Sequence, residues 1–139
     1  MNTISAIFTI YTNDYSLDEL IDIYNFPFDE KWKKWSNIIL QNNPSISSNL
    51  KREHNSLILK KISEDSIDMS TALIPLIEKL KENKSVIKQF SWKINYELWI
   101  KIYSNVEPVI NIDYKSLKFL WDIQCSLDID QYIVKDDFI

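Results

Sequence analysis

The segment KINYELWIKIY, residues 93–103, alternates polar and apolar side chains from its first residue to its last. Neighbouring side chains of a β-strand point to opposite faces of a sheet, so this alternation predicts a strand with one buried face. The other face carries Trp99 and Tyr103 beside charged residues. Such a composition is typical of a protein-binding surface, and the alternative is that a helix covers both aromatic residues as part of the core.

The residues that follow this strand predict a hairpin, a helix and a last strand. Residues 104–108 have the composition of a turn, and residues 109–112 are expected to return antiparallel. A helix is expected over residues 115–123, where apolar side chains recur at helical spacing. Alternation resumes over residues 127–133, which predicts a closing strand.

The beginning of the chain predicts a strand followed by a short helix. Residues 3–11 alternate like a strand, and residues 17–24 carry an apolar helical stripe. Ser16 and Glu19 have the spacing of a capping box, in which each side chain accepts a hydrogen bond from an otherwise unpaired backbone N–H. Residues 36–56 are rich in Asn and Ser and are expected to form a long polar loop, a type of segment that is often functional.

The middle of the chain predicts another strand and helix. Residues 57–62 form the strand, a helix follows to about residue 83, and residues 86–90 add one more turn. Pro75 fits such a helix only in its first turn or at a kink. A further strand is expected somewhere within residues 31–40.

This order of elements predicts an α+β fold: a ferredoxin-like α/β sandwich with a mostly antiparallel sheet and helices packed on one face. The 139 residues are expected to form a single domain over residues 1–139. Within it, residues 36–56 form the long polar loop and residues 135–139 a frayed tail.

The chain contains no glycine. Glycine-based phosphate loops and the G-x-S-x-G nucleophile elbow are therefore absent, which excludes the enzyme classes that depend on them. Turns that need a positive φ must use Asn or Asp, which are the next most tolerant residues, and Asn is abundant in this chain. The expected positive-φ positions are Asn13, Asn43, Asn83 and Asn105.

The formal net charge is −4, which argues against nucleic acid as a partner. No signal peptide or run of 18 apolar residues is found, so the expectation is a cytoplasmic protein with no membrane partner. Cys125 is the only cysteine and is expected to be a buried structural thiol; the alternative is a nucleophile paired with the remote His54. No ligand spacing predicts a metal or a cofactor.

Several side chains are candidates for partner contacts. Trp32 and Trp35 alternate with lysines, which suits either a stacking platform or simple packing of the two indoles. Asp128 and Asp130 lie two residues apart and so share one face of the closing strand, as cation ligands or as a solvated face. The candidate partner-binding residues are therefore Trp32, Trp35, Trp99, Tyr103, Asp128 and Asp130.

Short motifs at both ends of the chain resemble a bacterial family, domain of unknown function 4279. They are FTIY at 8–11, NDYSLDEL at 13–20, Pro27, WKK at 32–34, the helix at 73–80 and SLDIDQY at 126–132. The family tends to have Gly where this chain has Trp35, which questions a tight turn there, and Trp where this chain has Leu57. The resemblance carries no catalytic residues. It implies a small cytosolic protein, and some members lie near polymorphic-toxin genes.

Three functions follow as hypotheses. The first is a non-enzymatic protein-binding module, an immunity protein that neutralises a cognate toxin. The alternative is a small-molecule-binding or regulatory domain with a pocket between sheet and helices. The third and weakest is an enzyme that uses Asp128, Asp130 or His54.

Overall fold

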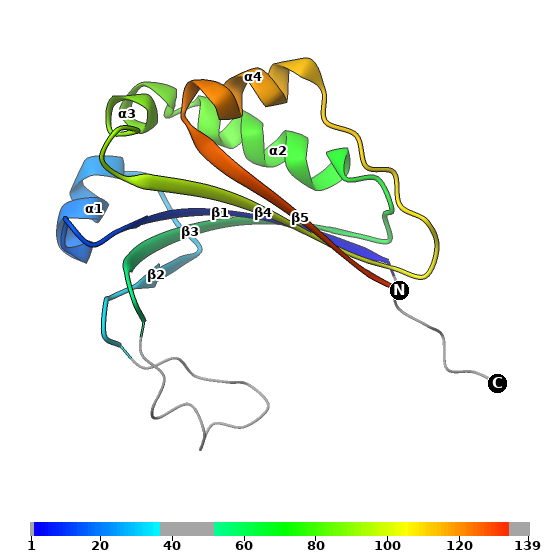
Figure 1. Ribbon diagram of the computed structural model, residues 1–139, viewed down its shortest axis with the longest axis horizontal. Helices are drawn as coiled ribbons and strands as arrows, with labels where there is room; N and C mark the ends of the chain where they lie inside the picture. Colours follow the sequence, from blue (N-terminus) through cyan, green and yellow to red (C-terminus); the bar gives the residue numbers. More distant parts are fainter. Residues whose placement is uncertain (1, 37–51, 134–139) are drawn as a thin grey trace.

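The alternating segments at residues 3–11 and 93–103 form two adjacent strands of a five-stranded sheet, and the first of them is its central strand (Figure 1). The computed structural model describes residues 2–36 and 52–133. The strands, in sheet order, are β2 (Glu30–Trp32), β3 (Asn55–Glu64), β1 (Thr3–Thr12), β4 (Asn95–Ser104) and β5 (Cys125–Ile133). β1 pairs antiparallel with both β3 and β4, whereas β5 pairs parallel with β4.

Period-two alternation places one apolar row from each central strand on the same face of the sheet. Phe8 lies between Leu59 of β3 and Leu98 of β4, and all three side chains are fully buried. Burying each such side chain contributes about 1.5–3 kcal/mol to folding. The helix side of the sheet is therefore dry along β1, β4 and the first half of β3.

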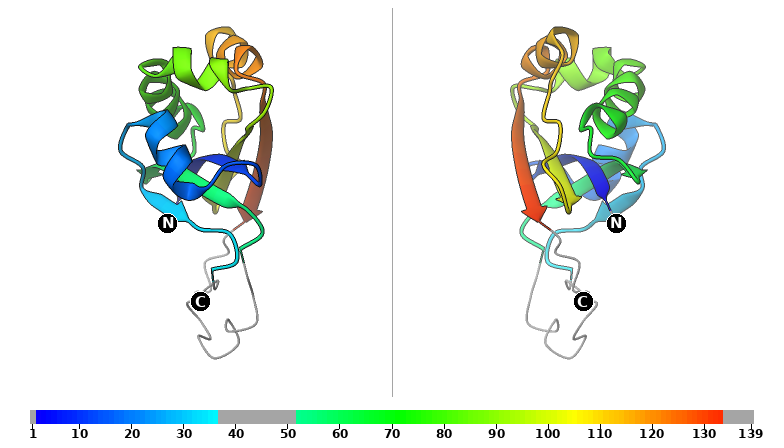
Figure 2. Two further views of the ribbon diagram at one scale, coloured as in Figure 1. Left: turned by 90° about the vertical axis from the view of Figure 1, so that its left-hand side faces the viewer. Right: turned by 90° about the vertical axis from the view of Figure 1, so that its right-hand side faces the viewer.

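Four helices in the described part of the chain cover this dry face (Figures 1 and 2). They are α1 (Leu17–Tyr24), α2 (Ser70–Lys81), α3 (Lys84–Gln89) and α4 (Tyr114–Asp122). α1 starts with the expected capping box of Ser16 and Glu19. Within residues 2–36 and 52–133, no helix is long and apolar enough to cross a membrane.

A hydrogen-bonded pair of tyrosines ties α1 to the sheet and to α3. The hydroxyl groups of Tyr24 and Tyr96 lie 2.6 Å apart, and the Tyr96 hydroxyl donates to the Ile87 carbonyl at 2.7 Å. Burial raises the pKa of both phenols, that of Tyr96 to about 12. Both side chains are therefore neutral in the folded protein at ordinary pH.

The α+β class is confirmed, but the expected hairpin after β4 is wrong. Residues 109–112 do not pair with β4; Val109 instead bridges to Asp68 beside the start of α2. The chain then forms α4 and returns as β5 parallel to β4, as a crossover through a helix requires. The sheet is consequently mixed rather than mostly antiparallel, and the ferredoxin-like arrangement is not confirmed.

Pro75 does not lie in the first turn of α2, the first of the two expected positions. It is the sixth residue of α2, beyond the first turn, and the helix continues through it. A proline at this position leaves the carbonyl of Thr71 without its usual N–H partner. Both residues are exposed, so water can satisfy that carbonyl.

The positive-φ positions differ from those expected. Among the described residues they are Trp35 (69°), Asp65 (54°) and Gln124 (57°). Asn13, Asn83 and Asn105 do not adopt this conformation, and Asn43 lies outside the described residues. A residue in the left-handed conformation commonly ends a helix, and Gln124 directly follows the C-cap residue of α4.

The long polar loop is described only at its two ends. Trp35 N–H donates to Arg52 O and Arg52 N–H donates to Ser36 O, both at 2.8 Å, so the flanks are joined. The strand expected within residues 31–40 is β2, which starts one residue earlier, at Glu30. Residues 37–51 and the tail at 135–139 lie outside the described residues.

Candidate functional site

The sheet face opposite the helices is called the open face here. No described helix lies on it (Figure 2). Its side chains follow from strand alternation and register, and they come from all five strands. They include Glu30, Trp32, Ser56, Ile58, Lys60, Ser5, Ile7, Thr9, Tyr11, Glu97, Trp99, Lys101, Tyr103, Ser126, Asp128, Asp130 and Tyr132.

Trp99 lies near the middle of the open face and is held by two charged neighbours. Its indole N–H donates to the Asp130 carboxylate at 2.7 Å, and the Lys101 ammonium lies 4.0 Å from its ring centroid. A hydrogen bond at the ring edge and a cation over the ring face together fix the indole orientation. Trp99 is thus a half-buried, pre-oriented aromatic side chain and not a core residue.

One end of the open face carries a pair of stacked tyrosines. Tyr103 and Tyr132 are cross-strand partners whose ring centroids lie 4.9 Å apart with an interplanar angle of 15°. Tyr132 is 42% exposed at the edge strand. Stacking on a neighbouring strand limits the rotation of both rings, so little conformational entropy remains to be lost on binding.

The opposite end of the open face is built from β2, β3 and the residues just before β3. The Arg52 guanidinium lies 3.7 Å from the Trp32 ring centroid, and Lys60 forms an ion pair with Glu30. Tyr11 packs against His54 with ring centroids 5.1 Å apart. Aromatic rings and charges therefore alternate at this end as well.

A shallow pocket of about 270 Å³ opens on the same end of the face. It is lined by Thr9, Tyr11, His54, Ser56 and Glu97. Among the described residues, the buried Nδ1 atom of His54 and the buried Nε atom of Arg52 have no hydrogen-bond partner. Burial and then the adjacent Asp128 carboxylate raise the pKa of Glu97 above its ordinary value.

The structure brings five of the six candidate partner-binding residues onto this one face. Trp32, Trp99, Tyr103, Asp128 and Asp130 belong to the open face. The sixth residue, Trp35, is 67% exposed in the turn that follows β2. Sequence reasoning treated these residues as separate features, because only the order of the strands shows that they share a face.

Two aromatic members of the open face were missed from the sequence. Tyr11 and Tyr132 continue the alternating rows of β1 and β5, so the signal was present in the same period-two pattern. The contact of Arg52 with Trp32 had no such signal, because it joins residues on either side of a long loop. Among the described residues, no three His, Cys, Asp or Glu side chains are grouped so that they could hold a metal ion.

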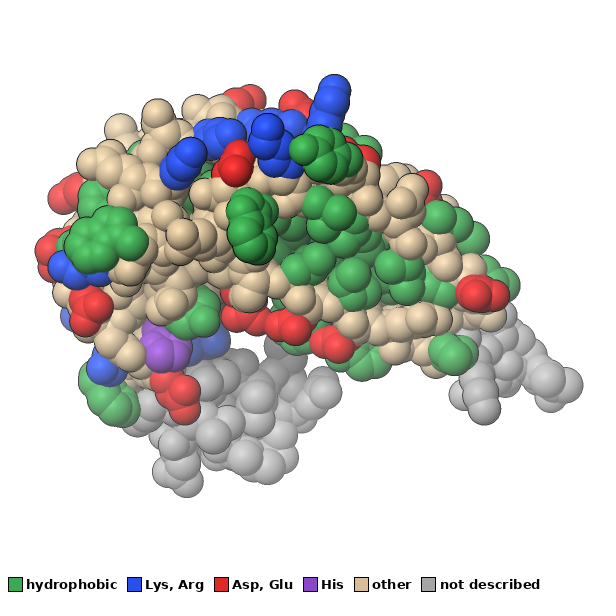
Figure 3. All heavy atoms as spheres, turned by 45° about the horizontal axis from the view of Figure 1, so that its top comes forward, with side chains coloured by type: hydrophobic (Ala, Val, Ile, Leu, Met, Phe, Trp, Pro, Cys, Tyr) green, Lys and Arg blue, Asp and Glu red, His purple; other side chains and the backbone are tan. Residues whose placement is uncertain are grey.

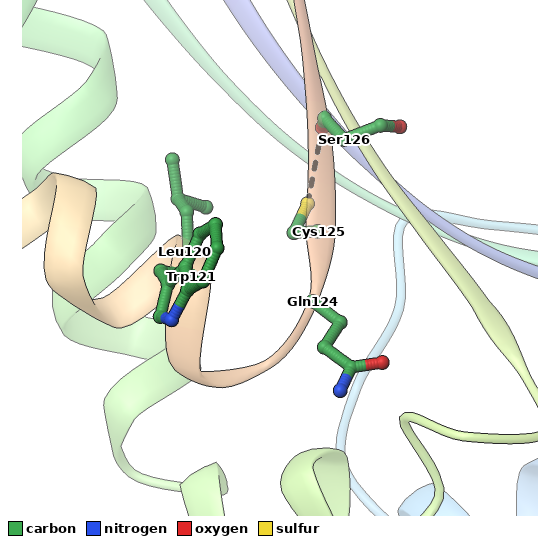
Figure 4. Close-up of a pocket in the computed structure, with 5 residues that line it drawn as sticks. All are labelled: Leu120, Trp121, Gln124, Cys125 and Ser126. Carbon is green, nitrogen blue, oxygen red and sulfur yellow. Dashed lines mark hydrogen bonds between the residues drawn. The ribbon is translucent and has the colours of Figure 1, made fainter.

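A second pocket, of about 480 Å³, lies at the turn between α4 and β5 (Figure 4). Leu120 and Trp121 at the end of α4 lie on one side of it and Cys125 at the start of β5 on the other. Cys125 is half-buried, and burial raises the pKa of its thiol to about 12. The thiol is thus protonated at neutral pH and is a poor nucleophile.

Comparison with known proteins gives one result. A family profile described as "Domain of unknown function (DUF4279)" matches residues 2–134, nearly the whole chain. No curated protein and no solved structure matches. The matched range spans all five strands and all four helices of the described chain, so the chain belongs to the DUF4279 family.

Proposed function

We propose that the protein is a non-enzymatic protein-binding module whose contact surface is the open face together with the exposed Trp35 in the turn that follows β2. The observation that carries this proposal is that five of the six candidate contact residues, with two further tyrosines, lie on one sheet face that no described helix covers. Trp and Tyr dominate the binding energy of protein interfaces. A face with this composition is suited to burial against another protein.

The aromatic side chains of the open face are already oriented before any partner binds. Trp99 is held by Asp130 and Lys101, Tyr103 by Tyr132, and Trp32 by Arg52. Ordering a free side chain at an interface costs about 0.5–1.5 kcal/mol. Because these rings have lost much of that freedom already, more of their contact energy is available for affinity.

We further propose that the partner is a toxin, and that the protein is a bacterial immunity protein acting in the cytoplasm. The resemblance to a family with members near toxin genes motivates this proposal. The net charge of −4 also suits a basic partner such as a nuclease, because opposite charges accelerate encounter. A lone cysteine is compatible with a reducing compartment.

The decisive experiment is binding to the proteins encoded next to this one. Each neighbour is purified and titrated with the wild-type chain, with Trp35→Ala and with Tyr132→Ala by isothermal titration calorimetry. Both residues are exposed, so truncating them spares the core. We expect one neighbour to bind, and each variant to weaken that binding roughly tenfold or more.

Trp92→Ala is the matched control, because Trp92 is 76% exposed between α3 and β4, outside the open face. It should bind the partner as the wild type does. If no neighbour binds, or if all three variants bind equally well, the proposal fails. Coexpression with the neighbour then tests the immunity role: the wild type should restore growth and the Trp35 and Tyr132 variants should not.

The pocket beside His54 favours a second candidate function, the binding of a small molecule. Its specific support is that His54, whose buried Nδ1 atom has no hydrogen-bond partner among the described residues, lines this pocket together with Tyr11 and Glu97. A ligand that binds only the folded state raises the melting temperature. A metabolite library screened by thermal shift, with His54→Ala as control, would reveal a compound that stabilises only the wild type; absence of such a compound counts against this function.

A further inference from the structure

A cluster of lysines lies on the helix layer, on the side of the sheet away from the open face. Figure 3 shows these basic side chains gathered along the top of the molecule. They come from the end of α2, from α3 and from α4, and we name them the lysine groove: Lys81, Lys84, Lys88, Lys115 and Lys118.

The lysine groove consists of two neighbouring hollows that share Lys84. The first, of about 370 Å³, is lined by Lys81, Lys84, Lys115, Lys118, Phe119 and Asp122. The second, of about 400 Å³, is lined by Lys84, Ser85, Lys88 and Gln89. Phe119 is only 3% exposed and is part of the core, so the first hollow rests on fixed packing.

The positive charge of the groove is only partly neutralised within the described chain. Lys84 pairs with Asp122 at 3.3 Å, and Lys81 pairs with Glu78 at 3.6 Å. Lys88, Lys115 and Lys118 make no ion pair with any described residue. Like charges on one helix face repel each other, and here they gather in a protein whose net charge is −4.

The residue types in the groove indicate which anion it suits. Its cations are all lysines, whose ammonium groups act as point charges with three donors and bind phosphate readily. The lining contains no arginine, whose planar fork holds a single carboxylate or phosphate through two parallel hydrogen bonds; several separate ammonium groups instead suit an anion that carries several charged groups. From this geometry we propose that the lysine groove binds clustered phosphate groups. The source is either a free polyphosphate anion or the headgroups of an anionic lipid surface.

The test is calorimetric titration of the full chain with sodium tripolyphosphate at low ionic strength. The wild type is compared with the double variant Lys115→Gln/Lys118→Gln, whose residues are on the exposed side of α4. Each exposed charge pair is worth roughly threefold in affinity, so the double variant should bind roughly tenfold more weakly. A parallel arm replaces tripolyphosphate with vesicles containing phosphatidylglycerol and measures cosedimentation.

The double variant Lys31→Gln/Lys33→Gln is the matched control, because it removes the same net charge from exposed lysines in and beside β2. It should bind like the wild type. If the α4 variant, but not the control, loses tripolyphosphate binding, the result supports a free anion. If the α4 variant, but not the control, loses vesicle binding, the result supports a lipid surface. Absence of binding in both arms, or equal weakening in the control, overturns the proposal. None of these results bears on the proposed binding of a protein partner to the open face, because that binding is measured in a separate experiment.

Discussion

Trp35 occupies a backbone position that suits glycine. Its φ of 69° lies in the left-handed region, at the third residue of a turn closed by the hydrogen bond from Ser36 N–H to Lys33 O. A bulky residue with this φ costs roughly 1–2 kcal/mol. The expected doubt about a tight turn at residue 35 is wrong: the turn is present, with Trp35 in the left-handed conformation. Strain of this kind is typical of functional sites, which supports Trp35 as a contact residue.

Comparing Trp35→Gly with Trp35→Ala separates this strain from the loss of the indole. Both variants lose the side chain, but only glycine adopts a positive φ without a steric penalty. We expect the Gly variant to have a free energy of unfolding about 1 kcal/mol higher than the Ala variant, as measured by urea denaturation. Both should lose partner affinity to the same extent. Equal stability of the two would show that the turn is unstrained.

The two buried tyrosines should respond unequally to loss of their hydroxyl groups. Tyr96 donates to the Ile87 carbonyl, so Tyr24 must donate to the Tyr96 oxygen. Tyr96→Phe leaves both partners unsatisfied, at a cost of about 1–3 kcal/mol each, whereas Tyr24→Phe removes only the end of the chain of hydrogen bonds. Chemical denaturation should therefore show Tyr96→Phe to be the less stable variant. The opposite order would reverse the assigned donor direction.

At the scale of elements, the long alternating segments were predictable, whereas residues 109–112 were assigned to a strand that they do not form. β1, β4 and β5 each span nine or ten residues, and the predicted ranges lie within two residues of them. Residues 109–112 are too few for alternation to distinguish a strand from a crossing segment. The parallel pairing of β5 with β4 joins residues that are far apart in the sequence, so the local alternation of polar and apolar residues could not predict it. For the same reason, the local alternation could not show that Trp32 and Trp99 share a face of the sheet.

The crossover from β4 to β5 depends on the start of α4. The Asp113 carboxylate accepts hydrogen bonds from the backbone N–H and the hydroxyl of Ser116, and the hydroxyl contact keeps the pKa of Asp113 below its ordinary value. Asp113→Ala should lower the melting temperature, because two donors lose their acceptor. Asp113→Asn, which keeps a capping oxygen, should melt near the wild type. An unchanged melting temperature for the Ala variant would mean that this cap does not stabilise α4.

At the scale of the whole molecule, the layers separate two kinds of surface. Four described helices cover one side of the sheet (Figure 2) and carry the lysine groove (Figure 3), while the aromatic open face is formed by the other side of the sheet. The two surfaces share no residue. Substitutions on one are therefore expected to leave binding at the other unchanged, since independent distant sites behave additively.

The buried phenols and the thiol predict a loss of stability at alkaline pH. Folding raises the pKa of Tyr96 to about 12 from an ordinary value of 10.0, and that of Cys125 to about 12 from 9.0. The unfolded chain releases these protons first, so their contribution is complete below pH 9 and declines toward pH 12. Above pH 10, Tyr96 alone should lower the free energy of unfolding by about 1.4 kcal/mol per pH unit.

Urea denaturation at a series of pH values measures this decline. Cys125→Ala should remove the part that begins near pH 9, because the shifted thiol is gone. Tyr24→Phe keeps the Tyr96 phenol and should retain the decline above pH 10 that Tyr96 causes. A free energy of unfolding that stays constant from pH 9 to pH 12 would contradict the burial of these groups.

The central place of β1 has a consequence for biosynthesis. β1 is translated before both of its neighbours, and its second neighbour, β4, ends at Ser104. At about 5–20 residues per second, a ribosome needs roughly 5–20 s to complete β4 after β1 has been made. Throughout that interval at least one edge of a strongly apolar strand has no partner. We therefore expect the newly made chain to be most prone to aggregation during this interval, because an unpaired strand edge can pair with another chain.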